Sequence, residues 1–365
     1  MSSFNQPTVL QIGDLLDRLA AEPRQIAERL FDVEIAQGRL VPTTEMIPWI
    51  ERQFGDIDAT CQQTIVRIQN RFTLESALFN PLRSRRPNGA ITDSAALDQW
   101  IAEELRHDIF ADPLRDTPAD LFGRIVGRYC VSASNIAKYD GWHGLVIPHE
   151  AHPLHFDEAQ ISDYLDVALR WIRAAQEHDP LARYPLITWN CLPKSGATIV
   201  HSHWQIAIAR SMAYSRVELW RRAATHYHAE TGRWYFADFA QLHQALGLLL
   251  DLKGLKGLHG LIHLTPLRSR ELILLADRSV DTPTLAQAIH ACLRRLVDDL
   301  GTRSLNMAIA LPPLGDPQWQ GFPILVRIGD RGAVLTSRND IGAMELYGTP
   351  VIAEDPFVVA QQLKA

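Results

Sequence analysis

The pattern that most limits the possible fold is a succession of strand, strand, helix, strand and strand between residues 123 and 209. The helical part has apolar residues three and four positions apart, which is typical of an amphipathic helix. The flanking runs are rich in Val, Ile, Leu and Tyr and predict strands at residues 123–134, 143–148, 184–190 and 199–209, around a helix at 156–178. This order predicts an α+β unit in which the helix packs on an antiparallel sheet.

A similar succession recurs downstream and indicates an internal duplication. Strands are expected at residues 260–267, 271–276, 305–313 and 322–329, around a helix at 281–301 that starts with a Thr-Pro pair. Upstream, residues 10–75 have helical spacing, and a further helix is expected at 94–110. The chain therefore divides into a helical N-terminal segment (1–75), a first repeat (76–225) and a second, degenerate repeat (226–365).

The segment WNCLPKSGATIVHSHWQ, residues 189–205, ends in a cluster of polar residues. In a strand, alternate side chains point to opposite faces, so His201, His203 and Gln205 are expected on one open face and their apolar neighbours on the other. Asn190 and a turn containing Gly196 precede them. Two histidines one residue apart are most often a half-exposed surface pair, so the surrounding residues decide what they do.

These residues resemble the active-site strand of the galactose-1-phosphate uridylyltransferase branch of the histidine triad (HIT) superfamily. In that branch an Asn and a Gly-containing loop precede a His-x-His-x-Gln motif. Asn190, Gly196, His201, His203 and Gln205 fall at the matching places.

A second stretch, SNIAKYDGWHGLVIPHEAH, resembles the other motif of the same superfamily. Asn135 takes its ribose-contacting position, and His143 and His152 take its two histidine positions. The resemblance covers residues 76–225 well and the second repeat weakly. It implies HIT-like antiparallel sheets with packed helices and two tandem HIT-like repeats.

The resemblance implies a nucleotidyltransferase or a phosphorylase in which His203 attacks the α-phosphorus of a nucleotide. A neutral imidazole needs no separate base for this attack, and a covalent intermediate splits the displacement into two steps. Gln205 would donate a hydrogen bond to the phosphoryl oxygens, with His201 beside it. Because the hydrolase branch has a third histidine where this chain has Gln205, transfer is favoured over hydrolysis.

The substrate-binding residues follow from the same motifs. Backbone N–H groups at Ser195 and Gly196, with Lys194, form either a phosphate cradle or an ordinary loop. Asn190 is expected to fix that loop or to contact the nucleotide, and His143 is expected to bind the substrate. Asn135 contacts a ribose hydroxyl or caps a turn. The basic stretch with Arg83 and Arg85 binds phosphate or is a plain surface loop.

This sequence departs from the pattern of the resembled branch at the structural zinc site that several relatives carry. They hold it with an upstream CxxC pair and with histidines at the positions of His152 and His201. Here the upstream stretch RHDIFADPL contains no cysteine, although His107, Asp108 and Asp112 could supply ligands. Zinc is therefore one possibility, and loss of the metal with His201 engaged only in hydrogen bonds is the other.

Composition and charge limit the partners and the cellular location that can be expected for this chain. A net charge of −6 gives no general attraction for nucleic acid or acidic membranes. The start lacks a signal-peptide pattern and no stretch is apolar enough to span a membrane, so a cytoplasmic location is expected. The expected partners are a nucleotide sugar or dinucleotide, a phosphate acceptor and, from the resemblance, a second copy in a homodimer. A nucleotide hydrolase and a non-catalytic nucleotide sensor are the alternatives.

Overall fold

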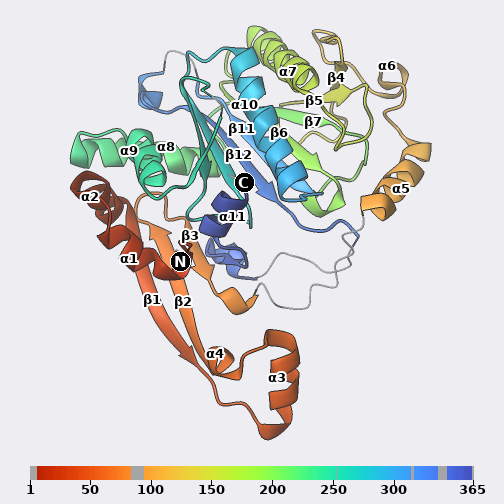
Figure 1. Ribbon diagram of the computed structural model, residues 1–365. Helices are drawn as coiled ribbons and strands as arrows, with labels where there is room; N and C mark the ends of the chain where they lie inside the picture. The colour runs from red at the N-terminus through yellow and green to blue at the C-terminus, as the bar shows by residue number, and fades with distance from the viewer. Residues whose placement is uncertain (1–5, 84–93, 253, 314–315, 336–342, 364–365) are drawn as a thin grey trace.

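The computed structural model describes residues 6–83, 94–252, 254–313, 316–335 and 343–363, and a nine-stranded antiparallel sheet forms its centre (Figure 1). The strand order is β4-β5-β7-β6-β11-β12-β10-β9-β8. The first half of this sheet contains β4 (Cys130–Ser134), β5 (Trp142–Pro148), β6 (Tyr184–Cys191) and β7 (Trp204–Ala209). The second half contains β8 (Leu249–Leu250), β9 (Leu258–Ile262), β10 (Leu272–Ala276), β11 (Leu305–Ala310) and β12 (Ile324–Asp330).

The two halves have the same strand order. In chain order, the four main strands of each half lie first, second, fourth, third, as β4-β5-β7-β6 and as β9-β10-β12-β11. They join where β6 pairs with β11, which places Asn190 opposite Asn306 and Trp189 opposite Met307. The expected α+β architecture of antiparallel strands and packed helices is therefore confirmed.

Two helices cover one face of the sheet, α7 (Glu158–His178) and α10 (Thr282–Arg294) (Figure 1). A capping box of Asp157 and Gln160 starts α7, and the Asp281 side chain accepts from Thr284 N–H at the start of α10. On α7, Tyr164 packs edge-on against Trp204 of β7. The apolar side of each helix thus fixes which side chains of the sheet are buried.

In the first half of the sheet, successive side chains alternate between the face covered by α7 and the opposite face, and the polar residues lie on the opposite face. In β6, Ile187, Trp189 and Cys191 are fully buried, whereas the residues between them are half-buried. In β7, Trp204 lies on the α7 face, so Gln205 lies on the opposite one. His143 of β5 shares that face, because its neighbour Gly144 packs against Trp171 of α7.

The prediction of a wholly helical N-terminal segment is wrong. Strands β1 (Phe31–Arg39) and β2 (Gln62–Asn70) lie within it and form a second sheet with β3 (Ser76–Phe79) and β13 (Val351–Ile352). Phe31, Val33 and Ile35 alternate with polar residues, a period of two that short helices on either side obscured. Those helices are α1 (Ile12–Asp17), α2 (Ala21–Leu30), α3 (Ile47–Phe54) and α4 (Ile57–Cys61).

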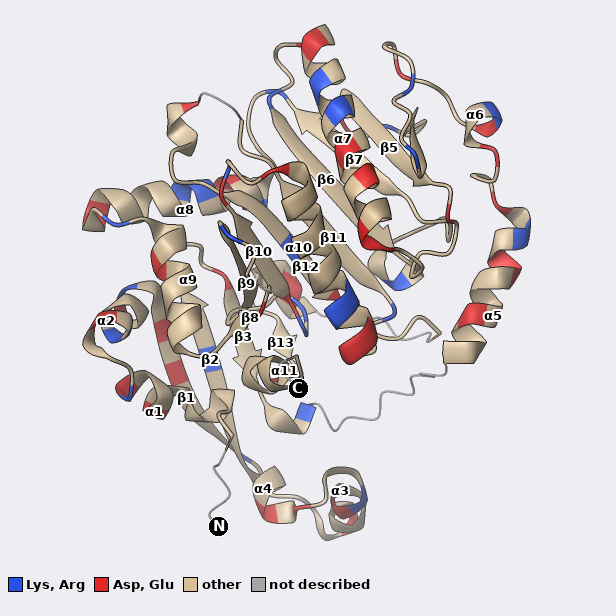
Figure 2. Ribbon diagram, turned by 45° about the horizontal axis from the view of Figure 1, so that its top comes forward, with Lys and Arg blue, Asp and Glu red and all other residues tan. Residues whose placement is uncertain are grey.

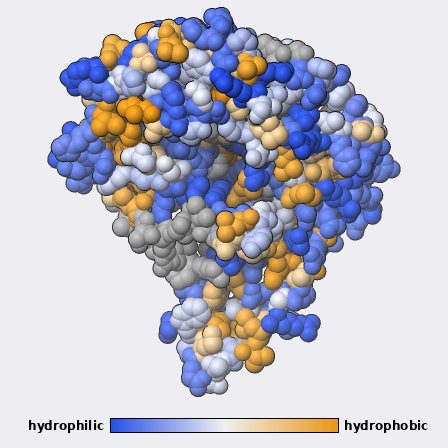
Figure 3. Space-filling view, turned by 180° about the vertical axis from the view of Figure 1, so that it is seen from behind, coloured by the Kyte–Doolittle hydropathy of each residue, from blue (hydrophilic) through white to orange (hydrophobic). Residues whose placement is uncertain are grey.

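The β1–β2 hairpin projects away from the main body and ends near α3 (Figure 1). Ile35, Val41 and Trp49 are exposed on this projection, by 48%, 96% and 47%. Hydrophobic residues stand out on it when the molecule is viewed from behind (Figure 3). The described part of the chain therefore leaves this apolar arm uncovered.

Helices α8 (Ser215–Thr231) and α9 (Tyr235–Ala245) link the two halves and were not expected from the sequence. Trp220 of α8 lies 5.5 Å from the guanidinium carbon of Arg327, on the face of β12 opposite α10. Arg327 also pairs with Glu75, which follows β2, and with Glu271. Burial raises the pKa of the Glu75 carboxyl, but the nearby positive charges, Arg327 first among them, together outweigh it, so the net pKa is lowered. A buried charge cluster therefore joins the second half to the N-terminal sheet.

Three further helices complete the fold: α5 (Ser94–Glu104), α6 (Pro113–Asp116) and α11 (Pro356–Gln362). Basic and acidic residues are interspersed over the surface in Figure 2, in keeping with the low net charge. Among the described residues, no helix is both long and apolar enough to cross a membrane. Cys130, Cys191 and Cys292 are buried free thiols, as expected for small apolar residues.

We predict that Gly144→Ala destabilises the protein while Gly141→Ala does not. A Cβ at position 144 would lie 2.5 Å from the Trp171 ring, which is fully buried and donates to Asp120 Oδ2. A Cβ at position 141 meets nothing within 4 Å. Overpacking of this kind costs about 2 kcal/mol of unfolding free energy, measurable by urea denaturation. Equal stability of the two variants would contradict the packing of α7 on β5.

Candidate active site

The two histidines of the His-x-His-x-Gln motif lie in the segment that leads into β7, not within a regular strand. The strand starts at Trp204, and residues 201–203 have no strand hydrogen bonding. The side chains are also buried, His201 with 4% and His203 with 6% of its surface exposed. The expected open strand face is therefore wrong for these two residues, because the segment of residues 105–110 covers them.

The His203 ring is held in one tautomer by its own backbone neighbour. Its Nδ1 lies 2.8 Å from the His201 carbonyl oxygen, which only accepts hydrogen bonds, so Nδ1 carries the proton. Burial lowers the pKa of the His203 imidazole. The ring is therefore neutral near pH 7, and its Nε2 lone pair has no hydrogen-bond donor among the described residues.

His201 is engaged at both ring nitrogens. Its Nδ1 lies 2.6 Å from Asp108 Oδ2, and its Nε2 lies 2.8 Å from the Pro148 carbonyl oxygen. Both partners are hydrogen-bond acceptors, so the ring is held on both sides. The other Asp108 oxygen, Oδ1, accepts from Phe110 N–H at 2.8 Å. Asp108 therefore fixes the His201 ring and the covering segment together.

Phe110 packs edge-on against both histidine rings. Its ring centroid is 5.8 Å from that of His201 and 5.4 Å from that of His203. Leu145 and Ile147 of β5 complete a small buried cluster with it. This apolar cover is the physical cause of the lowered His203 pKa, since it removes water that would solvate the charged ring.

Gln205 is oriented by His143. The His143 Nε2 lies 3.1 Å from Gln205 Oε1, and the His143 Nδ1 faces the Tyr139 N–H at 3.4 Å. Burial lowers the pKa of His143, which keeps this ring neutral. Because the Gln205 oxygen is held, its amide NH₂ is directed elsewhere and serves as a donor. The structure thus brings His143 and Gln205, which come from two different motifs, into contact.

Asn135 caps a turn at the edge of this cluster. Its Oδ1 accepts from Ala137 N–H at 3.0 Å, and its amide nitrogen lies 3.2 Å from His143 Nε2. The nearby Lys138 ammonium donates to the Ser134 hydroxyl and to the His143 carbonyl oxygen. Of the two roles expected for Asn135, turn capping is the one that these contacts display.

The loop between β6 and the histidines contains the short helix η5 (Pro193–Ser195). The Ser195 N–H donates to the Leu192 carbonyl oxygen and the Gly196 N–H to that of Pro193. These two amides are already satisfied within the turn, so of the two alternatives, a phosphate cradle or an ordinary loop, they match the ordinary loop. Gly196 has a φ of 95°, a left-handed conformation that favours glycine, and Lys194 is half-buried beside it.

The second half of the sheet holds this loop in place. Asn306 of β11 donates from its amide nitrogen to Asn190 Oδ1 and to the Ser195 carbonyl oxygen, both at 2.8 Å. Arg331 in turn donates to Asn306 Oδ1 at 3.0 Å. Asn190 therefore fixes the loop, one of its two expected roles. Neither Asn306 nor Arg331 was singled out from the sequence, because no local motif marks them.

The described residues do not fit a zinc site built on His152 and His201. Both His201 nitrogens face other partners, and the His152 Nδ1 accepts from Leu154 N–H at 3.2 Å. The His152 Nε2 is 3.6 Å from Asp98 Oδ1 and has no hydrogen-bond partner. No group of three or more His, Cys, Asp or Glu residues in the described ranges is placed to hold a metal. Asp108 occupies the Nδ1 side of the His201 ring, and the Pro148 carbonyl oxygen occupies its Nε2 side.

The basic stretch is only partly described. Arg83 ends the short helix η3 (Pro81–Arg83). Arg85 lies outside the described residues, so the phosphate-binding interpretation of this stretch remains a prediction.

Two aromatic residues at the site had no role predicted from the sequence. The Tyr139 ring lies beside that of His143, with 3.8 Å between their centroids. Phe110 was missed because a single aromatic residue in an irregular segment carries no signal of what it covers.

Comparisons with known proteins identify the fold. No known family profile and no curated protein sequence matches this chain. An ADP-glucose phosphorylase from Arabidopsis thaliana, solved with bound ADP-glucose, is similar with a TM-score of 0.62 and 16% identity, over 81% of this chain and 97% of that chain. A GalT-like protein from Arabidopsis thaliana is similar with a TM-score of 0.57 and 17% identity, over 70% of this chain and 90% of that chain. A uridylyltransferase is similar with a TM-score of 0.56 and 16% identity, over 68% of this chain and 87% of that chain.

These three structures bear the names of enzymes in the branch that the motifs resemble. The mixed α+β fold of antiparallel sheets and packed helices that the resemblance implies is therefore confirmed. The similarity covers 97% of the ADP-glucose phosphorylase structure, so nearly all of that fold has a counterpart in this chain.

Loss of the Asp108 carboxylate should destabilise the fold. Asp108→Asn leaves a buried imidazole facing no charge and should lower the unfolding free energy by about 3 kcal/mol. Asp112→Asn is the control, because Asp112 is half-exposed at the start of α6 and asparagine also caps helices. Urea denaturation of both variants measures the difference. Equal midpoints would show that the Asp108–His201 pair contributes nothing.

Proposed function

We propose that this protein is a nucleotidyltransferase or phosphorylase that acts on a nucleotide sugar or a dinucleoside polyphosphate through His203. The observation that carries the proposal is the His203 ring itself: it is buried, its Nδ1 proton points at the His201 carbonyl oxygen, and Nε2 keeps its lone pair. A neutral, oriented imidazole of this kind is a nucleophile that needs no separate base.

In the first step, His203 Nε2 attacks the α-phosphorus of the nucleotide. The new P–N bond forms as the bond from phosphorus to the bridging oxygen breaks, and that electron pair leaves with the distal phosphate group. Nδ1 keeps its proton, so the nucleotidylated ring carries one positive charge directed at the His201 carbonyl oxygen. Negative charge on the phosphoryl oxygens is met by the Gln205 amide, whose orientation His143 fixes.

In the second step, an oxygen of the acceptor phosphate attacks the same phosphorus. The P–N bond breaks and its electron pair returns to Nε2, which restores the neutral ring. The acceptor is inorganic phosphate or a sugar phosphate. Gln205 in place of a third histidine, and Phe110 over both rings, favour a phosphate acceptor over water, because the cover limits the entry of solvent.

The substrate class rests on the fold neighbours and on the site. Two of them are named as an ADP-glucose phosphorylase and a uridylyltransferase, and the first holds ADP-glucose. Both names describe transfer at the phosphates of nucleotides. For this chain we extend the proposal to Asn190 and Lys194 as contacts of the phosphates, and to Asn135 as a contact of the ribose through its amide nitrogen.

We also propose that the two halves of the nine-stranded sheet are tandem HIT-like repeats, the second of them degenerate. Their identical strand order supports this interpretation, as does one helix between the second and third strands of each half. His143, His203 and Gln205 all belong to the first half and lie on one side of its sheet. In the second half, the corresponding face is covered by α8 and carries the buried Arg327 cluster.

A covalent intermediate should be detectable on His203. Enzyme mixed with α-labelled nucleoside diphosphate sugars or dinucleoside polyphosphates, without acceptor, should carry label on the peptide containing HSHWQ after an alkaline quench. Inorganic phosphate or a sugar phosphate added before the quench should discharge it. His203→Asn should show neither label nor turnover, while His155→Asn, at an exposed position, should retain both. Turnover without label on that peptide would exclude His203 as the nucleophile.

Removal of the Gln205 amide should slow the chemistry without preventing binding. Gln205→Ala deletes one donor to the developing charge and should reduce the rate of nucleotidylation by about 10² to 10³. Nucleotide affinity, measured by calorimetry in the absence of acceptor, should change much less. A variant with wild-type nucleotidylation would show that the amide points away from the phosphoryl group.

A further inference from the structure

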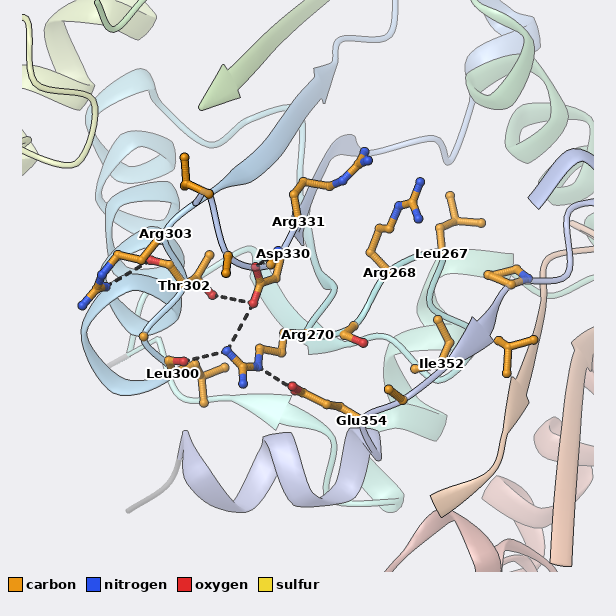
Figure 4. A pocket seen from close by; sticks show the side chains of 18 of the residues that line it. Leu267, Arg268, Arg270, Leu300, Thr302, Arg303, Asp330, Arg331, Ile352 and Glu354 are labelled. Carbon is orange, nitrogen blue, oxygen red and sulfur yellow. Dashed lines mark hydrogen bonds and ion pairs between the residues drawn. The ribbon is translucent and has the colours of Figure 1, made fainter. Parts of the chain in front are cut away.

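The cavity shown in Figure 4 lies beyond the end of β12 and has a volume of about 650 Å³. Its described lining includes none of the motif histidines. Charges in its wall pair with one another, Arg270 with Glu354 and Asp330, and Arg268 with Glu345. These pairs brace the wall of the cavity. The proposed nucleophile and the proposed amide donor lie elsewhere, in the first half of the sheet.

The turn between β4 and β5 places one large side chain over that site, the side chain of Tyr139. Its ring centroid lies 3.8 Å from that of His143, whose Nε2 contacts Gln205 Oε1. The Tyr139 hydroxyl shares a hydrogen bond with the Thr188 side chain on β6. Tyr139 therefore contacts β5 and β6, the two strands that flank Gln205 in the sheet.

The sheet register shows what the Tyr139 side chain crosses. Strand β7 lies between β5 and β6, and its Gln205 pairs directly with Thr188. The next residue of β7 on this face is Ala207, which pairs with His143 and is buried although its side chain is a single methyl group. A side chain that reaches from His143 to Thr188 crosses β7 beside Gln205. It therefore limits the rotation of the Gln205 side chain.

The turn itself is anchored by the residues on either side of Tyr139. The Lys138 ammonium donates to the His143 carbonyl oxygen at 2.8 Å, and the Asp140 carboxylate accepts from the Tyr214 hydroxyl at 2.8 Å. Tyr139 is 59% exposed, so its side chain adds little to the buried core. The contacts of its ring and hydroxyl are made with the site and not with the fold around it.

We propose that Tyr139 is a positioning residue, whose ring and hydroxyl hold the His143–Gln205 pair so that the Gln205 amide faces the phosphoryl group. The inference rests on the proposed function for the part in which this amide meets developing charge. His143 touches both Tyr139 and Gln205, so an orientation imposed by Tyr139 reaches the amide through one side chain. A donor that is oriented beforehand stabilises the transition state without reorganisation.

The first test measures the orientation of Gln205 independently of catalysis. In ¹⁵N relaxation of side-chain amides, the Gln205 signal is assigned by its absence from Gln205→Ala. Its NH₂ group should be rigid in the wild type and mobile on the picosecond-to-nanosecond timescale in Tyr139→Ala. Ile136→Ala is the matched control and should leave the amide rigid, because Ile136 lies in the same turn and is 84% exposed. An amide that is equally rigid in Tyr139→Ala would overturn the proposal.

The second test separates positioning from substrate contact. Tyr139→Ala should slow nucleotidylation of His203 about tenfold, while the calorimetric Kd of the nucleotide changes by less than about twofold. Tyr139→Phe keeps the ring against His143 and should recover part of the rate. Ile136→Ala should keep the wild-type rate. A higher Kd with an unchanged rate in Tyr139→Ala would make Tyr139 a substrate contact and overturn its positioning role.

The third test addresses the hydrogen bond between Tyr139 and Thr188. Tyr139→Phe and Thr188→Val each remove it, so each should slow nucleotidylation about threefold, and the double variant should be no slower than either one. Losses that multiply in the double variant would show that the bond does not act in positioning. If the wild type never carries label but the Gln205 amide becomes mobile in Tyr139→Ala, the covalent mechanism fails and the positioning of Gln205 by Tyr139 stands.

Discussion

Pairing of β6 with β11 is the constraint on which the rest of the structure depends. It joins the four strands of the first half to the five of the second in one sheet and places Asn190 directly opposite Asn306. Through this one contact, the second half of the chain holds the loop that precedes the histidines, because Asn306 donates to Asn190 and to the Ser195 carbonyl oxygen. The half without the His-x-His-x-Gln motif is therefore a working part of the site. It also brings Arg331, from beyond β12, to within one hydrogen bond of the loop.

The chemistry of the site follows from which groups are buried and what each one faces. Asp108 and His201 form a buried pair that anchors the covering segment, and the His201 backbone carbonyl then sets the tautomer of His203. Phe110 excludes water from both rings, which lowers the His203 pKa and keeps the ring neutral. His143 holds the Gln205 oxygen and so directs its amide outward. Each contact fixes an orientation in advance, as transfer through a covalent intermediate requires.

Much of this could be predicted from the sequence, and the failures have physical causes. The long helix α7 and the strands around it have clear periodicity, so the order of helix and strands in the first half was predicted correctly. Strands β1 and β2 were missed because short helices surround them. The start of β7 at Trp204 and the burial of His203 depend on the covering segment, which the alternation of residues 199–209 does not reveal. The partners of His201 and Asn190 lie 93 and 116 residues away in the chain, and no local pattern specifies such pairs.

The central claim is that His203 is a neutral nucleophile with its proton fixed on Nδ1. Long-range ¹H–¹⁵N correlation spectra of the histidine rings test it most directly, with the His203 signals assigned by their absence from His203→Asn. We expect a single neutral form protonated at Nδ1 at pH 7, and protonation of Nε2 only below the ordinary histidine pKa of about 6.5. A ring that is doubly protonated at pH 7, or neutral with its proton on Nε2, would contradict it.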